Sequence, residues 1–149
     1  MNRAPTAGRI AACLWAGPNT LLGLLAGGAV LCFGGQAQRI RGVVEFSGGL
    51  LGAVAAAMPA PMRFSAITFG HVILGVSKAE LSAVREHEHV HVRQYERWGP
   101  LFLPAYAASS AWQLICGRHG YRDNFFEREA YAADASLRAA VKPAASERR

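Results

Sequence analysis

The chain has 149 residues, of which 52% are hydrophobic and 17% are charged. This length suits one ordinary domain, and the composition is too apolar for a disordered protein. Sixteen Lys and Arg against ten Asp and Glu give a formal net charge of +6. Because the basic residues form no continuous stripe, we expect no nucleic-acid partner, and the charge favours at most an attraction to anionic membrane surfaces or acidic partners.

The cysteine pattern bears on the cellular compartment. Cys13, Cys32 and Cys116 form no close pair, which argues against a disulfide framework and against a CxxC metal or redox site. A reducing or membrane setting is expected instead. The run Ile10-Ala11-Ala12-Cys13 is similar to a lipoprotein cleavage box, but Arg9 directly precedes it. No apolar region stands before the box, so we expect no secretion by a cleavable signal peptide.

An uncharged, apolar stretch covers residues 10–38. It is longer than the roughly 20 residues that a membrane helix needs, so a membrane span is one interpretation. Pro18 interrupts the stretch, and a helix predicted from about Thr20 to Phe33 has the length of a core or interfacial helix. Both interpretations remain open, and the expected location is membrane-associated or cytoplasmic.

Two strands are predicted in the first half of the chain. Residues Arg39 to Phe46 alternate loosely between polar and apolar types and end before Gly48-Gly49. Residues Phe64 to Val76 are rich in β-branched and aromatic types, which favour strands. Between them lies an apolar, Ala-rich segment, Leu50 to Met58, which stops at Pro59.

One long helix is predicted from Ser77 to Trp98. Ser77-Lys78-Ala79-Glu80 has the spacing of a capping box, in which the Ser oxygen accepts a hydrogen bond from the amide three residues later. Good helix formers follow, and Gly99-Pro100 ends the run.

Two further helices are predicted in the last third. Pro104 lies near the first turn of a helix that ends at about Gly117. Asn124-Phe125-Phe126-Glu127 is a second candidate capping box and opens a last helix toward Val141. Residues 142–149 are polar, and we expect this tail to be frayed.

The predicted long helix contains the sequence His87-Glu88-His89-Val90-His91. In a helix, His87 and His91 lie on one face about 6 Å apart along the axis, which lets both imidazoles bind one tetrahedral zinc. Glu88 beside them suits a general base that activates a metal-bound water. In a strand, His89 would align with the other two, but the capping box and the Gly-Pro stop favour the helix.

A third metal ligand is expected downstream, because a catalytic zinc usually has three protein ligands. The chain resembles the gluzincin branch of the zincin metallopeptidases, closest to small uncharacterised bacterial, membrane-linked members, in which a Glu on a later helix completes the site. Glu127-Arg128-Glu129-Ala130 matches four positions of their Glu-x-x-Ala-Asp motif. The resemblance implies Glu127 as the ligand and Glu129 as the reserve. Tyr131 stands where those families carry an Asp that orients a zinc-binding histidine, so Asp134 is the candidate for that role.

The resemblance covers about residues 64–135 and implies an α+β, zincin-like fold. A single domain over residues 1–149 would pack the active-site helix beside a small sheet, with the apolar segment 10–38 as a helical addition. In zincins the strand before this helix is a sheet edge that binds extended peptide, which implies that role for Phe64 to Val76. His71 and Tyr131 are candidates for contacts with the substrate or the oxyanion.

The expected function is therefore zinc-dependent hydrolysis of peptide bonds in a peptide or protein substrate. The apolar segments add an expected association with a membrane, and the sequence leaves the oligomeric state open. Two alternatives stand beside this hypothesis. One is a non-catalytic zinc-binding module of the same fold, and the other is a small helical membrane or scaffold protein in which the motif is accidental.

Overall fold

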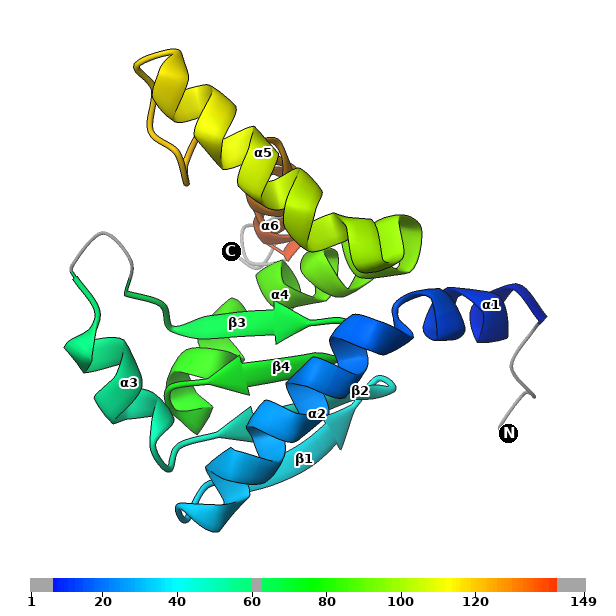
Figure 1. Ribbon diagram of the computed structural model, residues 1–149, viewed down its shortest axis with the longest axis vertical. Helices are drawn as coiled ribbons and strands as arrows, with labels where there is room; N and C mark the ends of the chain where they lie inside the picture. Colours follow the sequence, from blue (N-terminus) through cyan, green and yellow to red (C-terminus); the bar gives the residue numbers. More distant parts are fainter. Residues whose placement is uncertain (1–6, 60–62, 142–149) are drawn as a thin grey trace, which may run out of the picture. The chain divides into compact units, whose positions relative to one another are not determined.

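The computed structural model describes residues 7–59 and 63–141 (Figure 1). It is helix-rich and contains one small mixed sheet, so the predicted α+β class is confirmed. The chain forms two compact units, one up to Phe102 and the other from Leu103 onward. The predicted frayed tail, residues 142–149, lies outside the described residues.

The first unit contains most of the elements. They are α1 (Ala7–Trp15), α2 (Gly17–Cys32), β1 (Gln36–Ile40), β2 (Val43–Ser47), α3 (Leu51–Ala57), β3 (Ala66–Phe69), β4 (Val72–Gly75) and α4 (Lys78–Trp98). A short 3-10 helix, η2 (Gly99–Leu101), follows α4, and α5 (Phe102–Ile115) and α6 (Phe125–Val141) complete the described chain.

The sheet has the strand order β1-β2-β4-β3. β2 and β4 pair in parallel, whereas β1 and β3 are antiparallel to their neighbours and form the two edges. α2 covers one face of the sheet and α4 the other (Figure 1). Successive side chains of β4 point to opposite faces of the sheet. Val72 and Leu74 belong to the same hydrophobic cluster as Val30 of α2, and Ile73 belongs to the same cluster as Leu81 of α4.

Each of the two predicted strands is a hairpin, so both single-strand predictions are wrong. Within Arg39 to Phe46 the chain reverses at Arg41 (φ 51°) and Gly42 (φ 89°), and Ile40 pairs with Val43. Two consecutive positive φ angles are the geometry of a tight hairpin turn. The alternation of polar and apolar residues in the sequence continues through this turn and hides it. Arg is rarely found in the left-handed region, so Arg41 gave no turn signal.

The second predicted strand, Phe64 to Val76, reverses at Gly70 and His71, and Phe69 pairs with Val72. Gly70 has φ 59° and packs against Thr20, where any added Cβ would collide with the threonine side chain. His71 is consequently a turn residue rather than a strand residue. The short apolar runs on both sides of Gly70 read as one strand because a lone glycine is also tolerated inside strands.

The apolar N-terminal stretch forms α1 and α2. α2 begins at Gly17, so Pro18 lies in the first turn of the helix, where its missing N–H costs nothing. The predicted helix from Thr20 to Phe33 is thus confirmed and extended toward the N-terminus. In the described part of the chain, no helix combines the length and the apolar composition that a membrane crossing needs.

α4 has the predicted bounds. The Oγ of Ser77 accepts a hydrogen bond from the amide of Glu80 at 3.1 Å, which caps the N-terminus. Gly99, with φ 55°, ends the helix. Because both ends are fixed by local sequence, the residues between them keep a constant helical register.

The helices predicted after Pro104 and from Asn124 are α5 and α6. Asn124 is fully buried, and its Oδ1 accepts a hydrogen bond from the amide of Phe126 at 2.9 Å. Its amide nitrogen donates to the carbonyl of Tyr106 at 3.0 Å and to the Oγ of Ser110 at 2.7 Å. One side chain therefore caps α6 and ties its first turn to α5.

Packing of α2 against the sheet yields a first prediction. A Cβ on Gly23 would lie 2.6 Å from the Cβ of Val72, whereas a Cβ on Gly28 would meet nothing within 4 Å. We expect Gly23→Ala to lower the free energy of unfolding by about 1–3 kcal/mol through overpacking. The matched Gly28→Ala should leave it unchanged or raise it by up to about 1 kcal/mol. Denaturant unfolding of both variants measures this, and equal effects would contradict the packing of α2.

Candidate metal centre

His87 and His91 form a pair on one face of α4, and both are buried. Their Nε2 atoms lie 3.2 Å apart, and the rings meet edge to face with centroids 4.9 Å apart. Two nitrogens bound to one tetrahedral zinc at 2.0–2.1 Å would be separated by about 3.3 Å. The helical interpretation of the motif is confirmed, since α4 includes all three histidines.

Gln94, one turn beyond His91, orients the second imidazole. Its Oε1 lies 2.8 Å from the Nδ1 of His91, and the side chain is almost fully buried. Because an amide oxygen only accepts, the Nδ1 must carry the hydrogen, which places the lone pair of the ring on Nε2. A partner of this kind is typical of metal-binding histidines. Sequence reasoning missed Gln94, although its spacing of three residues from His91 was a usable signal.

Glu88 is buried and held by the edge strand β3. The Oγ1 of Thr68 donates to the Oε2 of Glu88 at 2.7 Å, and the hydroxyl of Tyr95 donates to the Thr68 carbonyl at 3.0 Å. Burial, with a smaller contribution from the negative charge of Glu88, raises the pKa of Tyr95, so its hydroxyl stays a neutral donor. Thr68 and Tyr95 thus tie α4 to the strand beside it, and Thr68 was not predicted as part of the site.

Arg85 lies two residues before His87 and forms an ion pair with Glu45. Its guanidinium binds both carboxylate oxygens of Glu45 on β2, at 2.8 and 3.1 Å. Gln38 on β1 donates to the same carboxylate at 2.7 Å. The Glu45 carboxylate is fully buried, and the hydrogen bond to it raises the pKa of Arg85. The charge of Arg85 is therefore matched inside the fold.

His89 lies between the two paired histidines in the sequence of α4 and is buried. Burial is the main cause that lowers the pKa of His89, which favours the neutral ring. Its Nε2 has no hydrogen-bond partner among the described residues. His89 is not part of the metal-binding group described below.

Glu127 lies in the first turn of α6 and is only 3% exposed. The hydroxyl of Tyr106, on α5, donates to its Oε1 at 2.8 Å. Burial, together with the charge of Glu127 and hydrogen bonds to Tyr131 and Glu127, raises the pKa of Tyr121. Glu127 is thus a buried carboxylate with tyrosine hydroxyls around it, a setting that the sequence motif did not reveal.

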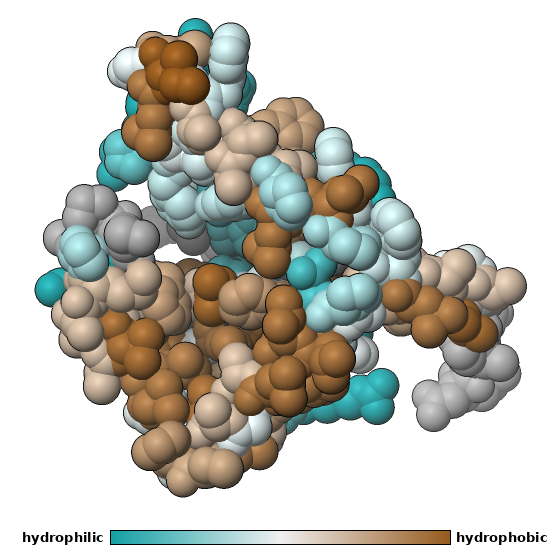
Figure 2. Space-filling view, in the orientation of Figure 1, coloured by the Kyte–Doolittle hydropathy of each residue, from teal (hydrophilic) through white to brown (hydrophobic). Residues whose placement is uncertain are grey.

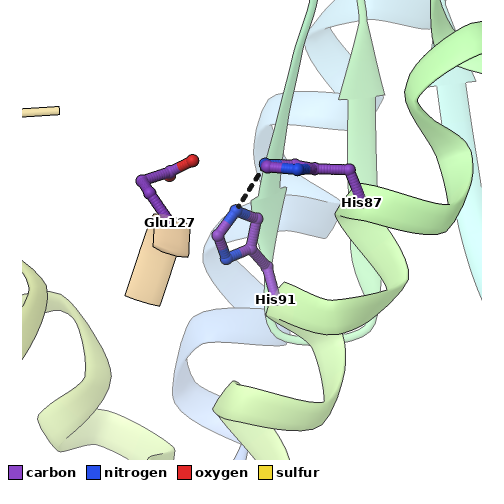
Figure 3. A group of neighbouring side chains, drawn as sticks. All are labelled: His87, His91 and Glu127. Carbon is purple, nitrogen blue, oxygen red and sulfur yellow. Dashed lines mark hydrogen bonds between the residues drawn. The ribbon is translucent and has the colours of Figure 1, made fainter. Parts of the chain in front are cut away.

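The ligand atoms of His87, His91 and Glu127 all lie within 4.8 Å of one another, close enough to bind one metal ion. Figure 3 draws these three side chains and marks the hydrogen bond between the two imidazoles. Of the two carboxylates predicted at this position, Glu127 belongs to the group and the reserve Glu129 does not, and neither does Asp134. Tyr131 is half-exposed and stacks edge to face on Tyr121.

His71 has partners of its own. Its Nε2 lies 3.0 Å from the Oε1 of Glu96, and its backbone amide donates to the Oγ1 of Thr20 at 3.1 Å. The Sγ of Cys13 lies 3.7 Å from the same Nε2. These contacts connect the β3–β4 turn to α2 and α4, and His71 is not a member of the metal-binding group. Contact of His71 with a substrate stays a prediction.

Comparison of the chain with protein-family models, with curated proteins and with solved structures found no match. The resemblance to zincins therefore stays a prediction.

Two of the ion pairs of α4, one with a buried carboxylate and one exposed, yield a second prediction. Glu45→Gln removes the buried charge that Arg85 binds, and we expect it to lower the free energy of unfolding by about 1.5–3 kcal/mol. Glu86→Gln breaks the exposed pair with Arg41 and should change it by less than about 1 kcal/mol. Thermal and denaturant unfolding compare the two variants. A larger loss from Glu86→Gln would show that the Glu45 pair does not anchor α4.

Proposed function

We propose that this protein is a zinc-dependent hydrolase of peptide bonds with a zincin-like active site. The observation that carries the proposal is the buried group of His87, His91 and Glu127, with Glu88 adjacent to the first ligand on the same helix. Two imidazoles and one carboxylate are a ligand set found in catalytic zinc sites, where a fourth position stays open. The mixed sheet with its antiparallel edge strand β3 beside α4 is compatible with the fold that the resemblance implies.

The donor set fits zinc better than the hard cations. Neutral imidazole nitrogens suit zinc and other transition metals, whereas magnesium and calcium prefer oxygen ligands. The hydrogen bond from His91 to Gln94 and the one from Tyr106 to Glu127 fix two of the three ligands before any ion arrives. A bound zinc would lower the pKa of a water molecule and polarise the carbonyl group under attack.

Glu88 acts as the general base. It takes a proton from the attacking water while the new bond forms between the water oxygen and the carbonyl carbon. As the carbon–nitrogen bond breaks, Glu88 passes this proton to the leaving amine, so the carboxylate ends the cycle unprotonated. Thr68 holds one carboxylate oxygen during these steps, which limits rotation of the side chain. The edge strand β3, which carries Thr68, lies where an extended peptide would add to the sheet.

Metal analysis tests the ligands. We expect one zinc per chain, strongly reduced in His87→Ala, His91→Ala and Glu127→Gln, because each change removes one ligand. Glu129→Gln is the matched control on the same helix and should retain the metal. A chain that carries no zinc after reconstitution, or a Glu129→Gln variant that loses it while Glu127→Gln does not, contradicts the proposed ligand set.

Substitution of Glu88 tests the hydrolytic step. Glu88→Gln keeps the size of the side chain and should retain zinc, while cleavage of a mixed peptide library should fall by at least about a hundredfold through loss of the base. Glu80→Gln, at an exposed position two turns earlier on α4, is the control and should keep the activity. Full zinc occupancy without cleavage in the native protein would instead indicate a non-catalytic zinc module.

The Gln94 side chain offers a test of ligand orientation. We expect Gln94→Leu to weaken zinc binding about 10–100-fold, since the Nδ1 of His91 loses its acceptor. Gln113→Leu on α5 is the control, because Gln113 contacts Arg118 and no proposed ligand. Competition with a chromogenic chelator measures both affinities. Unchanged affinity in Gln94→Leu would show that the hydrogen bond does not support the metal site.

A further inference from the structure

α2 packs on the sheet with its small residues inward. Its buried positions are Asn19, Gly23, Gly27 and Val30, and Gly27 lies so close to the Phe46 ring that a Cβ would collide with it. In an ordinary surface helix the large apolar residues face the core and the outer face is polar. Here glycine brings the helix close to the sheet, and the leucines are displaced to the outside.

The outer side of α2 carries five exposed leucines, which we term the leucine face. These side chains are between 43% and 66% exposed: Leu21, Leu22, Leu24, Leu25 and Leu31. In Figure 2, hydrophobic residues gather where Figure 1 draws α2. Apolar patches of this kind on a protein surface mark interaction sites.

The leucine face lacks polar groups that a protein partner would use. α2 has two polar side chains other than its cysteine: Asn19 is buried and donates to the carbonyl of Gly99, and Thr20 donates to the carbonyl of Ala16. Protein interfaces typically carry about one hydrogen bond per 100–200 Å². A hydrocarbon phase needs none, because every backbone group inside a helix is already paired.

A basic residue and a hollow lie beside the leucine face. A cavity of about 410 Å³ is lined by Leu21 and Leu24 of that face together with Val44, Val72, Thr20 and Arg39, among others. Arg39 is exposed and forms no ion pair among the described residues. Phosphate headgroups are the complement of an arginine at the rim of an apolar surface, and the net charge of +6 acts in the same direction.

We propose that the leucine face docks on a membrane surface rich in anionic phospholipid, with α2 parallel to the membrane plane and Arg39 at a lipid phosphate. The inner side of α2 is fixed to the sheet, so lipid reaches only its outer side. Burial of five leucines supplies the affinity, and Arg39 supplies the preference for anionic lipid. This inference goes beyond the proposed hydrolase and does not depend on the metal centre.

Vesicle sedimentation of the full chain tests the proposal. We expect the protein to sediment with vesicles of equal parts phosphatidylglycerol and phosphatidylcholine, and more weakly with phosphatidylcholine alone. Leu22→Gln with Leu25→Gln should weaken binding by at least about tenfold, because two exposed leucines no longer enter the lipid. Arg39→Gln should bind the two kinds of vesicle more equally, because binding to the anionic vesicles falls while binding to phosphatidylcholine vesicles is unchanged.

Val54→Gln on α3 is the matched control, since Val54 is also exposed but lies outside the leucine face. It should bind vesicles like the native chain. If circular dichroism shows that the double variant does not fold, the single variant Leu25→Gln replaces it. Leu25→Gln should still weaken binding more than Val54→Gln does.

Several outcomes would overturn the proposal. The native chain could remain in the supernatant with both kinds of vesicle, or the leucine variants could bind as well as the native chain. A dimer that dissociates in the leucine variants, without vesicle binding, would assign the face to a second copy of this chain. All measurements are repeated with a chelator present, so that failure of the zinc proposal leaves this result unaffected.

Discussion

The spacing of two imidazoles by one helical turn is the constraint on which the rest of the site depends. With their Nε2 atoms 3.2 Å apart, His87 and His91 either share a hydrogen bond or direct two lone pairs at one cation. The hydrogen bond of His91 to Gln94 favours the tautomer with a lone pair on Nε2. An ion at that point would attract a third ligand of opposite charge, and the ligand atoms of His87, His91 and Glu127 lie within 4.8 Å of one another.

Holding this pair in place requires that α4 does not rotate or slide on the sheet. Apolar packing alone permits small shifts, because a hydrophobic contact has no preferred direction. Directional bonds prevent them here: Thr68 binds Glu88 at one point of the helix, and Glu45 binds Arg85 at another. A buried polar group without a partner destabilises the folded protein. When all such groups have partners, their bonds fix one register of α4 on the sheet.

The two faces of the sheet illustrate opposite uses of a helix. α4 directs Glu88 and Arg85 toward the sheet, where Thr68 on β3 and Glu45 on β2 bind them. α2 directs glycine inward and leucine outward. Its position on the sheet is therefore set by close packing and not by hydrogen bonds to the sheet. A helix that buries little side-chain surface gains stability from close backbone approach, which explains why Gly23 and Gly27 lie where they do.

The sequence by itself determined the helices with clear ends and which residues of α4 share the face of His87 and His91, because capping and helical periodicity act over a few neighbours. It also pointed to Glu127 through a resemblance. Only the tertiary structure decided that Arg41-Gly42 and Gly70-His71 are turns, that Thr68 and Tyr106 hold the two acidic residues, and that α2 shows its leucines to the outside. These features depend on contacts between residues distant in the chain, and local propensity carries no information about them.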